Sequence, residues 1–245
     1  MGITITATGN AGVHVAGPGG AVFIDAFWDA APRLIGGQTR RAAPAQAADL
    51  ILVTHGHWDH FSPDRVAEAA GRLGAAVIGP AHVVRELRGL IDDRSLVELE
   101  PSEAGRGRPA GSASVRLPAA EVTAFRTSHG RGHNSYLVRM GRFTVFHDGD
   151  NEDTRPLDVR ALSPVDALFL CPWQGSAWET FVERLSPRLW VLIHLDEQEI
   201  ARHEAGRFLA DLADRVPLTD RTLALRPGEA HNLDEPESGE TSAAC

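Results

Sequence analysis

An apolar segment that runs into a cluster of histidines is the feature that most constrains this chain. Residues 48–55, ADLILVTH, are apolar on both faces, as expected of a strand buried within a sheet. The segment ends in THGHWDH, residues 54–60, which holds three histidines and an aspartate within six positions. Imidazole and carboxylate groups are ligands of zinc and similar divalent ions. A solvated turn rich in histidine is the alternative, and the position directly after a buried strand argues against it.

The spacing of these side chains suits two metal ions better than one. His55 and His57 lie two residues apart, as do His57 and Asp59, so their side chains can face one way from an extended loop. Asp59 and His60 are adjacent, so both cannot share that direction. In two-metal sites the ions lie about 3.5–4 Å apart and can hold a hydroxide between them. Such a pair needs further ligands, including one anion that bridges the metals.

Three other apolar strands end in residues of the same kind. His129 closes AFRTSH, Asp148 and Asp150 close FTVFHDGD, and His194 closes LWVLIH. Loops at strand ends can converge on one ligand, so four such ends are more specific than any single motif. The segment SHGRGH also contains His133, so either His129 or His133 could be the histidine ligand from this segment. In the same way, either Asp148 or Asp150 could be the bridging carboxylate.

The order of the apolar segments predicts a layered α/β domain, with strands dominating the first part and strand–helix alternation in both halves. Ser62 followed by Pro63 predicts the start of a helix directly after the cluster. Residues 101–114 are expected to form a loop. We predict one domain over residues 1–226 and a flexible acidic tail over residues 227–245.

Composition and charge narrow the function. All 24 basic residues are arginine, so chemistry that needs lysine, such as a Schiff base or a P-loop, is excluded. The net charge of −9 argues against a nucleic-acid partner, and no apolar run approaches the roughly 18 residues of a membrane span. No signal-peptide pattern is present, and the two cysteines, Cys171 and Cys245, fit a reducing cytoplasm better than a disulfide. We therefore expect a cytoplasmic protein with no membrane partner, and the sequence leaves its oligomeric state open.

The HxHxDH pattern in THGHWDH resembles the signature of the metallo-β-lactamase superfamily, and the other strand-end residues follow in that family's order. The resemblance covers residues 3–196. It implies an αββα sandwich, in which two mixed β-sheets are flanked by helices and a metal site lies at one edge. The segments GNAGVHVAGPGGAVFIDAF and ADLILVTHGHWDHFSP look most like the branch that contains L-ascorbate-6-phosphate lactonase. Asn10 and Ala26 depart from that branch, where histidine and proline are frequent.

The resemblance implies a dinuclear centre with two divalent ions, Zn²⁺ as the first choice and Mn²⁺ or Fe²⁺ as alternatives. Asp25, in VFIDAF, would have a structural role near the ligand loop. The residue at position 57 is histidine where some oxidoreductases of the superfamily carry glutamate, which favours hydrolysis. The family pattern selects His129 over His133 and Asp150 over Asp148. The implied ligands are His55, His57 and His129 for the first metal, Asp59, His60 and His194 for the second, and Asp150 as the bridge.

The function that follows is hydrolysis by a hydroxide that bridges the two metals, directed at an ester-like bond of a small molecule, with a lactone or a phosphoester preferred. Asp59 and Asp150 would be catalytic, Asp59 because it can orient the hydroxide as well as bind metal. His133 and His147 could protonate the leaving group or support the ligands from behind. The alternatives are a thioesterase or an amide or β-lactam hydrolase, a nucleic-acid phosphodiesterase, and a non-catalytic metal- or ligand-binding protein.

The substrate pocket is the least legible part of the sequence. Trp173 and Gln174 follow an apolar strand and could line the pocket or pack at a strand–helix corner. Arg126 and Arg131 flank His129 and could bind a phosphate or carboxylate of the substrate, or lie at the surface. We expect a small-molecule substrate, for which a negative charge is one option.

Overall fold

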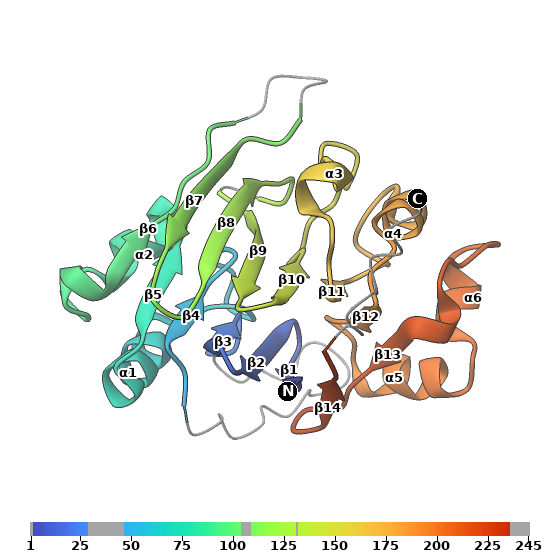
Figure 1. Ribbon diagram of the computed structural model, residues 1–245, viewed down its shortest axis with the longest axis horizontal. Coiled ribbons are helices and arrows are strands. Elements are labelled where there is room, and N and C mark those ends of the chain that lie inside the picture. The colour runs from blue at the N-terminus through green and yellow to red at the C-terminus, as the bar shows by residue number, and fades with distance from the viewer. Residues whose placement is uncertain (1, 29–46, 104–108, 131, 236–245) are drawn as a thin grey trace, which may run out of the picture.

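The apolar strands of the chain form two mixed sheets that pack face to face (Figure 1). The computed structural model describes residues 2–28, 47–103, 109–130 and 132–235, and within these ranges each sheet has seven strands. The first sheet, in the order β14-β1-β2-β3-β4-β5-β6, consists of β1 (Ile3–Gly9), β2 (Gly12–Gly17), β3 (Gly20–Ile24), β4 (Leu50–Leu52), β5 (Ala76–Gly79), β6 (Leu96–Glu98) and β14 (Ala230–Leu233). The second, in the order β13-β12-β11-β10-β9-β8-β7, consists of β7 (Ser112–Arg116), β8 (Glu121–Arg126), β9 (Asn134–Met140), β10 (Phe143–His147), β11 (Ala167–Leu170), β12 (Leu189–Leu192) and β13 (Thr222–Ala224).

In each sheet antiparallel strands lead into parallel ones. The strands β1, β2 and β3 pair antiparallel, and β3 to β6 pair parallel. In the same way β7 to β10 pair antiparallel, and β10 to β13 pair parallel. Ligand-binding loops of such sheets lie at the carboxyl ends of the parallel strands. The loops that follow β3, β4, β10 and β12 begin at such ends, and these loops carry most of the predicted ligands.

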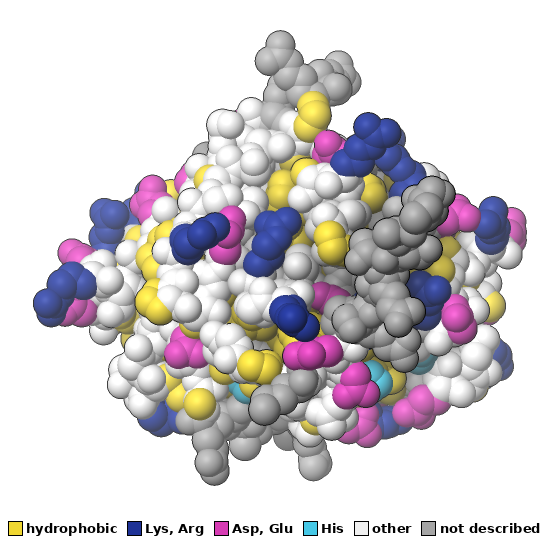
Figure 2. Space-filling view, in the orientation of Figure 1, with side chains coloured by type: hydrophobic (Ala, Val, Ile, Leu, Met, Phe, Trp, Pro, Cys, Tyr) yellow, Lys and Arg dark blue, Asp and Glu magenta, His cyan; other side chains and the backbone are white. Residues whose placement is uncertain are grey.

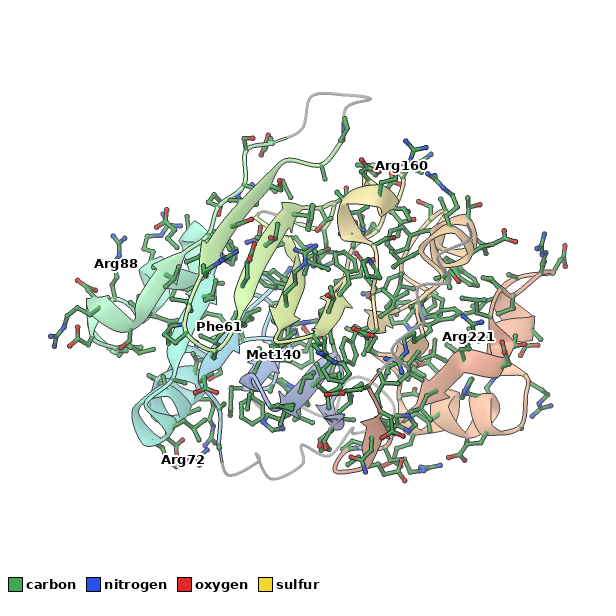
Figure 3. The ribbon with its side chains drawn as sticks, viewed as in Figure 1. Phe61, Arg72, Arg88, Met140, Arg160 and Arg221 are labelled. Carbon is green, nitrogen blue, oxygen red and sulfur yellow. The ribbon has the colours of Figure 1, made fainter. Side chains whose placement is uncertain are left out.

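Alternating side chains divide the core into three layers. Ile24 and Leu52 face the gap between the two sheets, where Met140 of β9 also lies (Figure 3). Their chain neighbours Phe23 and Ile51 face the opposite side, where helices cover the sheet. This arrangement is an αββα sandwich, so the predicted fold class is confirmed.

Helices cover the outer face of each sheet and close these layers (Figure 1). Within the described ranges, no helix is long and apolar enough to cross a membrane. The first sheet is covered by α1 (Pro63–Leu73) and α2 (Ala81–Leu87), and the second by α3 (Val159–Leu162), α4 (Trp178–Leu185), α5 (Glu197–Glu204) and α6 (Phe208–Leu212). Two short 3₁₀ helices, η1 (Asp93–Ser95) and η2 (Thr219–Arg221), precede β6 and β13.

The helix after the histidine cluster begins where the sequence predicts it. Ser62 has an extended backbone, with φ −130° and ψ 119°, and Pro63 is the first helical residue. Gly74 ends α1 in the left-handed conformation, with φ 68°, which only glycine adopts at little cost. The cluster is thus held between the buried strand β4 and a helix with fixed ends.

Two predictions about irregular segments are wrong. The loop predicted over residues 101–114 ends early, because β7 begins at Ser112 and pairs with β8. The tail predicted over residues 227–245 begins too early, because β14 pairs antiparallel with β1, with Ile3 opposite Leu233. Both strands lie at sheet edges and bury few side chains, so their apolar content is too low to mark them in the sequence. The remainder of the predicted tail, residues 236–245, lies outside the described residues.

Removal of β14 is expected to cost stability. A chain that ends after Pro227 should melt about 3–8 °C lower than a chain that ends after Glu235, because it loses the pairing with β1. It also loses the backbone oxygen of Asp234, which accepts a 2.8 Å hydrogen bond from the guanidinium of Arg188. Calorimetry of the two truncated proteins measures the difference, and equal melting temperatures would show that β14 contributes no stability.

Candidate metal centre

Loops from both sheets bring the predicted ligands together. The loops follow β3, β4, β8, β10 and β12, and their side chains form three overlapping groups. Within each group one ligand atom of every residue lies within 4.8 Å of the others. The groups are His55, His57, His129 and Asp150; Asp25, His55 and His60; and Asp59, His60 and His194.

The first group gathers three histidines around one carboxylate. The Nε2 atom of His55 lies 3.9 Å from Oδ2 of Asp150, and the Nε2 atom of His129 lies 3.7 Å from the same oxygen. His57 approaches this group through His129, with 3.1 Å between Nδ1 of His57 and Nε2 of His129. Of the two histidines of SHGRGH, His129 is the one whose nitrogen faces the carboxylate.

The group of Asp59, His60 and His194, called the second group from here on, lies against the same carboxylate. The Nε2 atom of His60 lies 3.1 Å from Oδ1 of Asp150, and the Nε2 atom of His194 lies 3.6 Å from Oδ2. His194 also lies 3.3 Å from Oδ2 of Asp59. Asp150 is therefore within reach of histidines from both groups, as a bridging ligand must be.

Several buried polar atoms of the cluster have no hydrogen-bond partner, which bears on whether these residues fit a metal. Four such atoms in the described part of the chain belong to the cluster, namely Nε2 of His55, His60 and His194 and Oδ1 of Asp150. His60 and Asp150 lie close to each other without meeting the geometry of a hydrogen bond. A buried polar atom without a partner is unfavourable unless a ligand satisfies it. The donor set, neutral imidazoles with carboxylates, is the one that zinc and related ions prefer, so the residues fit a divalent metal.

The charges of the cluster also fit a cation. Burial alone would raise the pKa of Asp150, but the nearby His60, His194 and His55 outweigh it and lower that pKa. Burial lowers the pKa of His55, which therefore stays neutral. Burial likewise opposes a proton on His60, but the carboxylates of Asp150 and Asp25 overcome it and raise the pKa of His60 well above its usual value. The same carboxylates that favour a proton on His60 would favour a bound cation, which takes the place of the proton on Nε2.

Asp25 holds the ligand loop from behind. Its carboxylate accepts hydrogen bonds from the backbone N–H of Thr54 at 2.8 Å and from the Thr54 hydroxyl at 2.6 Å. It also lies 2.8 Å from Nδ1 of His60. Because the Thr54 hydroxyl donates to Asp25, it accepts from Nδ1 of His55, at 2.9 Å. Both histidines therefore carry their proton on Nδ1 and present Nε2 to the cluster, and the structure gives Asp25 the supporting position that the resemblance implies.

Glu152 holds His129 in the same manner. The Nδ1 atom of His129 lies 2.9 Å from Oε1 of Glu152, which leaves Nε2 free to face the cluster. Sequence reasoning missed this residue, although an acidic pair follows Asp150 in DGDNED. The Glu152 side chain is 58% exposed, so it stands at the open side of the centre.

Loss of the Glu152 carboxylate should weaken metal binding at the first group. We expect Glu152→Ala to lower metal affinity about 10-fold, the lower end of the range for residues that orient a metal-binding histidine. Glu152→Gln should lie between the wild type and Glu152→Ala, because the amide oxygen can still accept from His129. Titration calorimetry of the metal-free proteins with Zn²⁺ measures the affinity. Glu68→Ala removes an exposed carboxylate of α1 and serves as the control, and an equal loss in both alanine variants would contradict the role of Glu152.

His133 lies behind the cluster. It is fully buried, and burial lowers its pKa to about 3, so the ring is neutral. Its Nε2 atom accepts a 3.0 Å hydrogen bond from the backbone N–H of Asp150, so Nδ1 carries the proton and donates to the hydroxyl of Thr127 at 2.7 Å. Gly149 makes this contact possible, since it has φ 60° and a Cβ there would lie 2.5 Å from Nε2 of His133. His133 therefore fixes the backbone that carries Asp150.

His147 and Asp148 are also turned away from the cluster. His147 is buried, donates from Nε2 to the backbone oxygen of Ala11 at 2.9 Å, and accepts from the N–H of Gly149 at 3.2 Å. Both nitrogens of His133 and of His147 are engaged in hydrogen bonds, which favours the supporting role that the sequence leaves open over proton donation to a leaving group. Asp148 accepts hydrogen bonds from Ser135 and Asn151, and burial raises its pKa to about 7. Of the two aspartates, Asp150 is the one whose oxygens face the histidines of the cluster.

Two of the residues proposed for the substrate pocket, Trp173 and Gln174, lie at the centre. Trp173 donates from its indole nitrogen to the backbone oxygen of His194 at 3.2 Å, and Gln174 donates to Oδ2 of Asp150 at 3.2 Å. Arg126 is engaged elsewhere, in an ion pair with Glu100. The second arginine of interest, Arg131, lies outside the described residues.

Asn10 joins two ligand loops, which sequence reasoning did not foresee. Its side-chain amide donates to the backbone oxygen of Asp59 at 3.0 Å and to Oδ2 of Asp59 at 3.3 Å. Its backbone oxygen accepts from the N–H of His194 at 2.9 Å. Asn10 and His194 both have positive φ angles, 51° and 60°, so the contact fixes unusual backbone on both sides. No local pattern marks this contact, because the residues it joins are far apart in the sequence.

Known proteins resemble the chain over most of its length. The family model of the beta-lactamase superfamily domain matches residues 21–216. A UPF0173 metal-dependent hydrolase of Thermococcus kodakarensis is 28% identical over 218 residues, which cover 82% of this chain and 90% of the relative. Another, from Carboxydothermus hydrogenoformans, is 31% identical over 193 residues, which cover 72% of this chain and 80% of the relative.

A solved structure shares the arrangement of the sheets. Igni18, a metallo hydrolase from the archaeon Ignicoccus hospitalis, superposes with a TM-score of 0.64 over 96% of this chain and 100% of its own. The two sequences are 17% identical, so this likeness concerns the fold alone.

Proposed function

Since the chain belongs to the beta-lactamase superfamily domain family, and within it to the UPF0173 metal-dependent hydrolases, we propose that it cleaves an ester-like bond in a small molecule. The observation that carries the proposal is the position of Asp150. Its carboxylate lies 3.1 to 3.9 Å from nitrogen atoms of four histidines, which belong to both ligand groups. A lactone or a phosphoester is the preferred substrate, in keeping with the likeness of the opening segments to the L-ascorbate-6-phosphate lactonase branch.

We propose that the centre holds two divalent ions. Zn²⁺ suits a site rich in histidine, and Mn²⁺ or Fe²⁺ are the alternatives. When bound, the ions would lower the pKa of a water molecule towards neutrality and polarise the reacting oxygen of the substrate. The residues that would hold them are His55, His57 and His129 for the first ion, Asp59, His60 and His194 for the second, and Asp150 for both.

Asp59 is the residue best suited to guide the attacking water. Burial raises its pKa, but His194 and His60 outweigh burial and lower it, so the carboxylate is ionised. Asn10 and His194 both approach the oxygen Oδ2. The other carboxylate oxygen of Asp59, Oδ1, can therefore orient the attacking water or accept a proton from that water. Gln174, which donates to Asp150, keeps the bridging carboxylate in place at the same time.

The alternatives have weaker support. On the face shown in Figure 2, arginine and acidic side chains are interspersed, and the net charge is −9, which disfavours a nucleic-acid substrate. A non-catalytic binding protein has no need for a bridging carboxylate and a free carboxylate oxygen at the open side of the centre. Thioester, amide or β-lactam substrates use the same chemistry and are separated by experiment. We retain the cytoplasm as the proposed location and a small molecule as the proposed partner.

A panel of substrates tests the function. Protein treated with a chelator should hydrolyse none of the lactones, esters, thioesters, amides, β-lactams and phosphodiesters tested, and addition of Zn²⁺, Mn²⁺ or Fe²⁺ should restore turnover of at least one class. The rate should follow the amount of metal bound, because the proposed nucleophile is a water molecule activated by the metal. Metal-loaded protein that is inert towards the whole panel would contradict the proposed hydrolysis.

A further inference from the structure

Two tryptophans are exposed beside the candidate metal centre. Trp58 is 47% exposed and Trp173 is 43% exposed. Only four large hydrophobic side chains are exposed in the described part of the chain, and the other two, Leu90 and Leu212, lie after α2 and at the end of α6. Half of the exposed large apolar groups are thus tryptophans within reach of the ligand loops.

Each tryptophan is tied to a different group of ligands. Trp58 lies between His57 and Asp59, in a turn where the backbone oxygen of His57 accepts from the N–H groups of His60 and Phe61. The turn fixes the backbone of Trp58, and its neighbours in the chain face the cluster. The indole therefore projects from the loop itself into the solvent at the open side.

Trp173 is fixed by a contact with the second group. Its indole nitrogen donates to the backbone oxygen of His194, and the two rings meet edge to face, with centroids 5.3 Å apart and planes at 75°. A ring held in this way loses little freedom when a ligand packs against it. Exposed aromatic carbon at a fixed position next to a reactive centre is typical of a binding site.

Among the residues that the structure describes, the charged side chains around the ligand groups favour a neutral substituent near these rings over an anionic one. The Glu152 side chain is 58% exposed at the same centre, and the guanidinium of Arg126 is paired with Glu100 and Glu103. Of the two preferred substrate classes, a phosphoester would bring its negative charge near Glu152. A neutral lactone or ester with an apolar substituent meets no such repulsion.

We infer that Trp58 and Trp173 bind an apolar part of the substrate, so that the protein acts on neutral lactones or esters that carry an alkyl or aryl group. This inference rests on the proposed hydrolysis and narrows its substrate class. Trp58 and Trp173 are then residues that determine specificity, because they contact the substituent of the substrate and leave the reacting atoms to the centre.

Lactones that share one ring and differ in their substituent test the inference. We expect the metal-loaded wild type to hydrolyse γ-octalactone and γ-phenyl-γ-butyrolactone with a kcat/KM about 10-fold or more above that of γ-butyrolactone. Trp58→Ala should lower this ratio at least about 5-fold while the protein keeps its bound metal. Trp173→Phe should give a smaller loss, because it keeps an aromatic ring. Leu90→Ala removes an exposed apolar side chain elsewhere and should leave the ratio unchanged.

The outcomes separate this inference from the proposed hydrolysis. If the wild type cleaves all three lactones equally, or if Trp58→Ala slows all three equally, the tryptophans do not select the substituent and the inference is wrong, although hydrolysis stands. If no lactone or ester is cleaved, the proposed hydrolysis of lactones and esters is wrong. The role of the tryptophans is then tested by ligand binding alone. Hexanamide should then bind tighter than acetamide, as followed by tryptophan fluorescence, and Trp58→Ala should remove the difference. Equal binding of the two amides to the wild type would overturn the inference.

Discussion

Replacement of Asp150 by asparagine is expected to remove most of the bound metal and to lower kcat/KM by about a thousandfold or more. The Asp150 carboxylate approaches histidine nitrogens of both ligand groups, and its Oδ1 atom is buried without a hydrogen-bond partner. An amide supplies a neutral oxygen in place of a charge and turns an N–H₂ donor towards atoms that must bind a cation. Metal analysis and steady-state kinetics with the best substrate of the panel measure the two losses.

Asp148→Asn is the matched control, because it makes the same change two residues away. Asp148 is buried and accepts hydrogen bonds from Ser135 and Asn151, and its oxygens do not face the ligand groups. We expect this variant to keep its metal and to lose less than about 10-fold in rate, with a stability loss of about 1–3 kcal/mol from the disturbed hydrogen bonds. A larger loss of metal in Asp148→Asn than in Asp150→Asn would show that the bridge is misplaced.

His129→Ala should remove or weaken one metal and abolish turnover. The Nε2 atom of His129 faces Asp150 and His57, and Glu152 holds the ring in that orientation. Alanine leaves the first group with one fewer imidazole, and water replaces it with much lower affinity. Metal content per chain and the rate with saturating metal are the two measurements.

His133→Ala is the control for the neighbouring histidine. It removes the ring that accepts the N–H of Asp150 and donates to Thr127, so we expect a melting temperature lower by about 4–10 °C, since a buried group and two hydrogen bonds are lost. Two metals should remain bound, with a partial loss of rate. If His133→Ala loses a metal and His129→Ala keeps both, the loop between β8 and β9 binds metal through the other histidine.

The strands and the ligand positions could be predicted from the sequence because both are local patterns. Buried strands such as β4 are short apolar runs, and HxHxDH places its ligands next to one of them. The resemblance to the metallo-β-lactamase superfamily then indicates which of the later strand-end residues are the remaining ligands. The structure brings all seven together at one edge of the two packed sheets, six from loops at the carboxyl ends of parallel strands and His129 from the loop after the antiparallel strand β8.

Asn10 and Glu152, which support the centre, could not be predicted, because they act across long distances in the chain. Asn10 reaches Asp59 across 49 positions, and no spacing in the sequence records that contact. His147 resembles a catalytic histidine in the sequence, yet its nitrogens bind the backbone of Ala11 and Gly149. The edge strands β7 and β14 were missed for a different reason, since strands with few buried side chains look like loops.

The metal content of the purified protein tests the central claim most directly. Protein isolated without chelators and supplied with Zn²⁺ should contain about two metal ions per chain by elemental analysis, because the Asp150 carboxylate lies against His55 and His129 on one side and against His60 and His194 on the other. The same preparation should lose hydrolysis in step with its metal during dialysis against a chelator. A content that stays at one ion per chain when more metal is added would contradict the bridged centre.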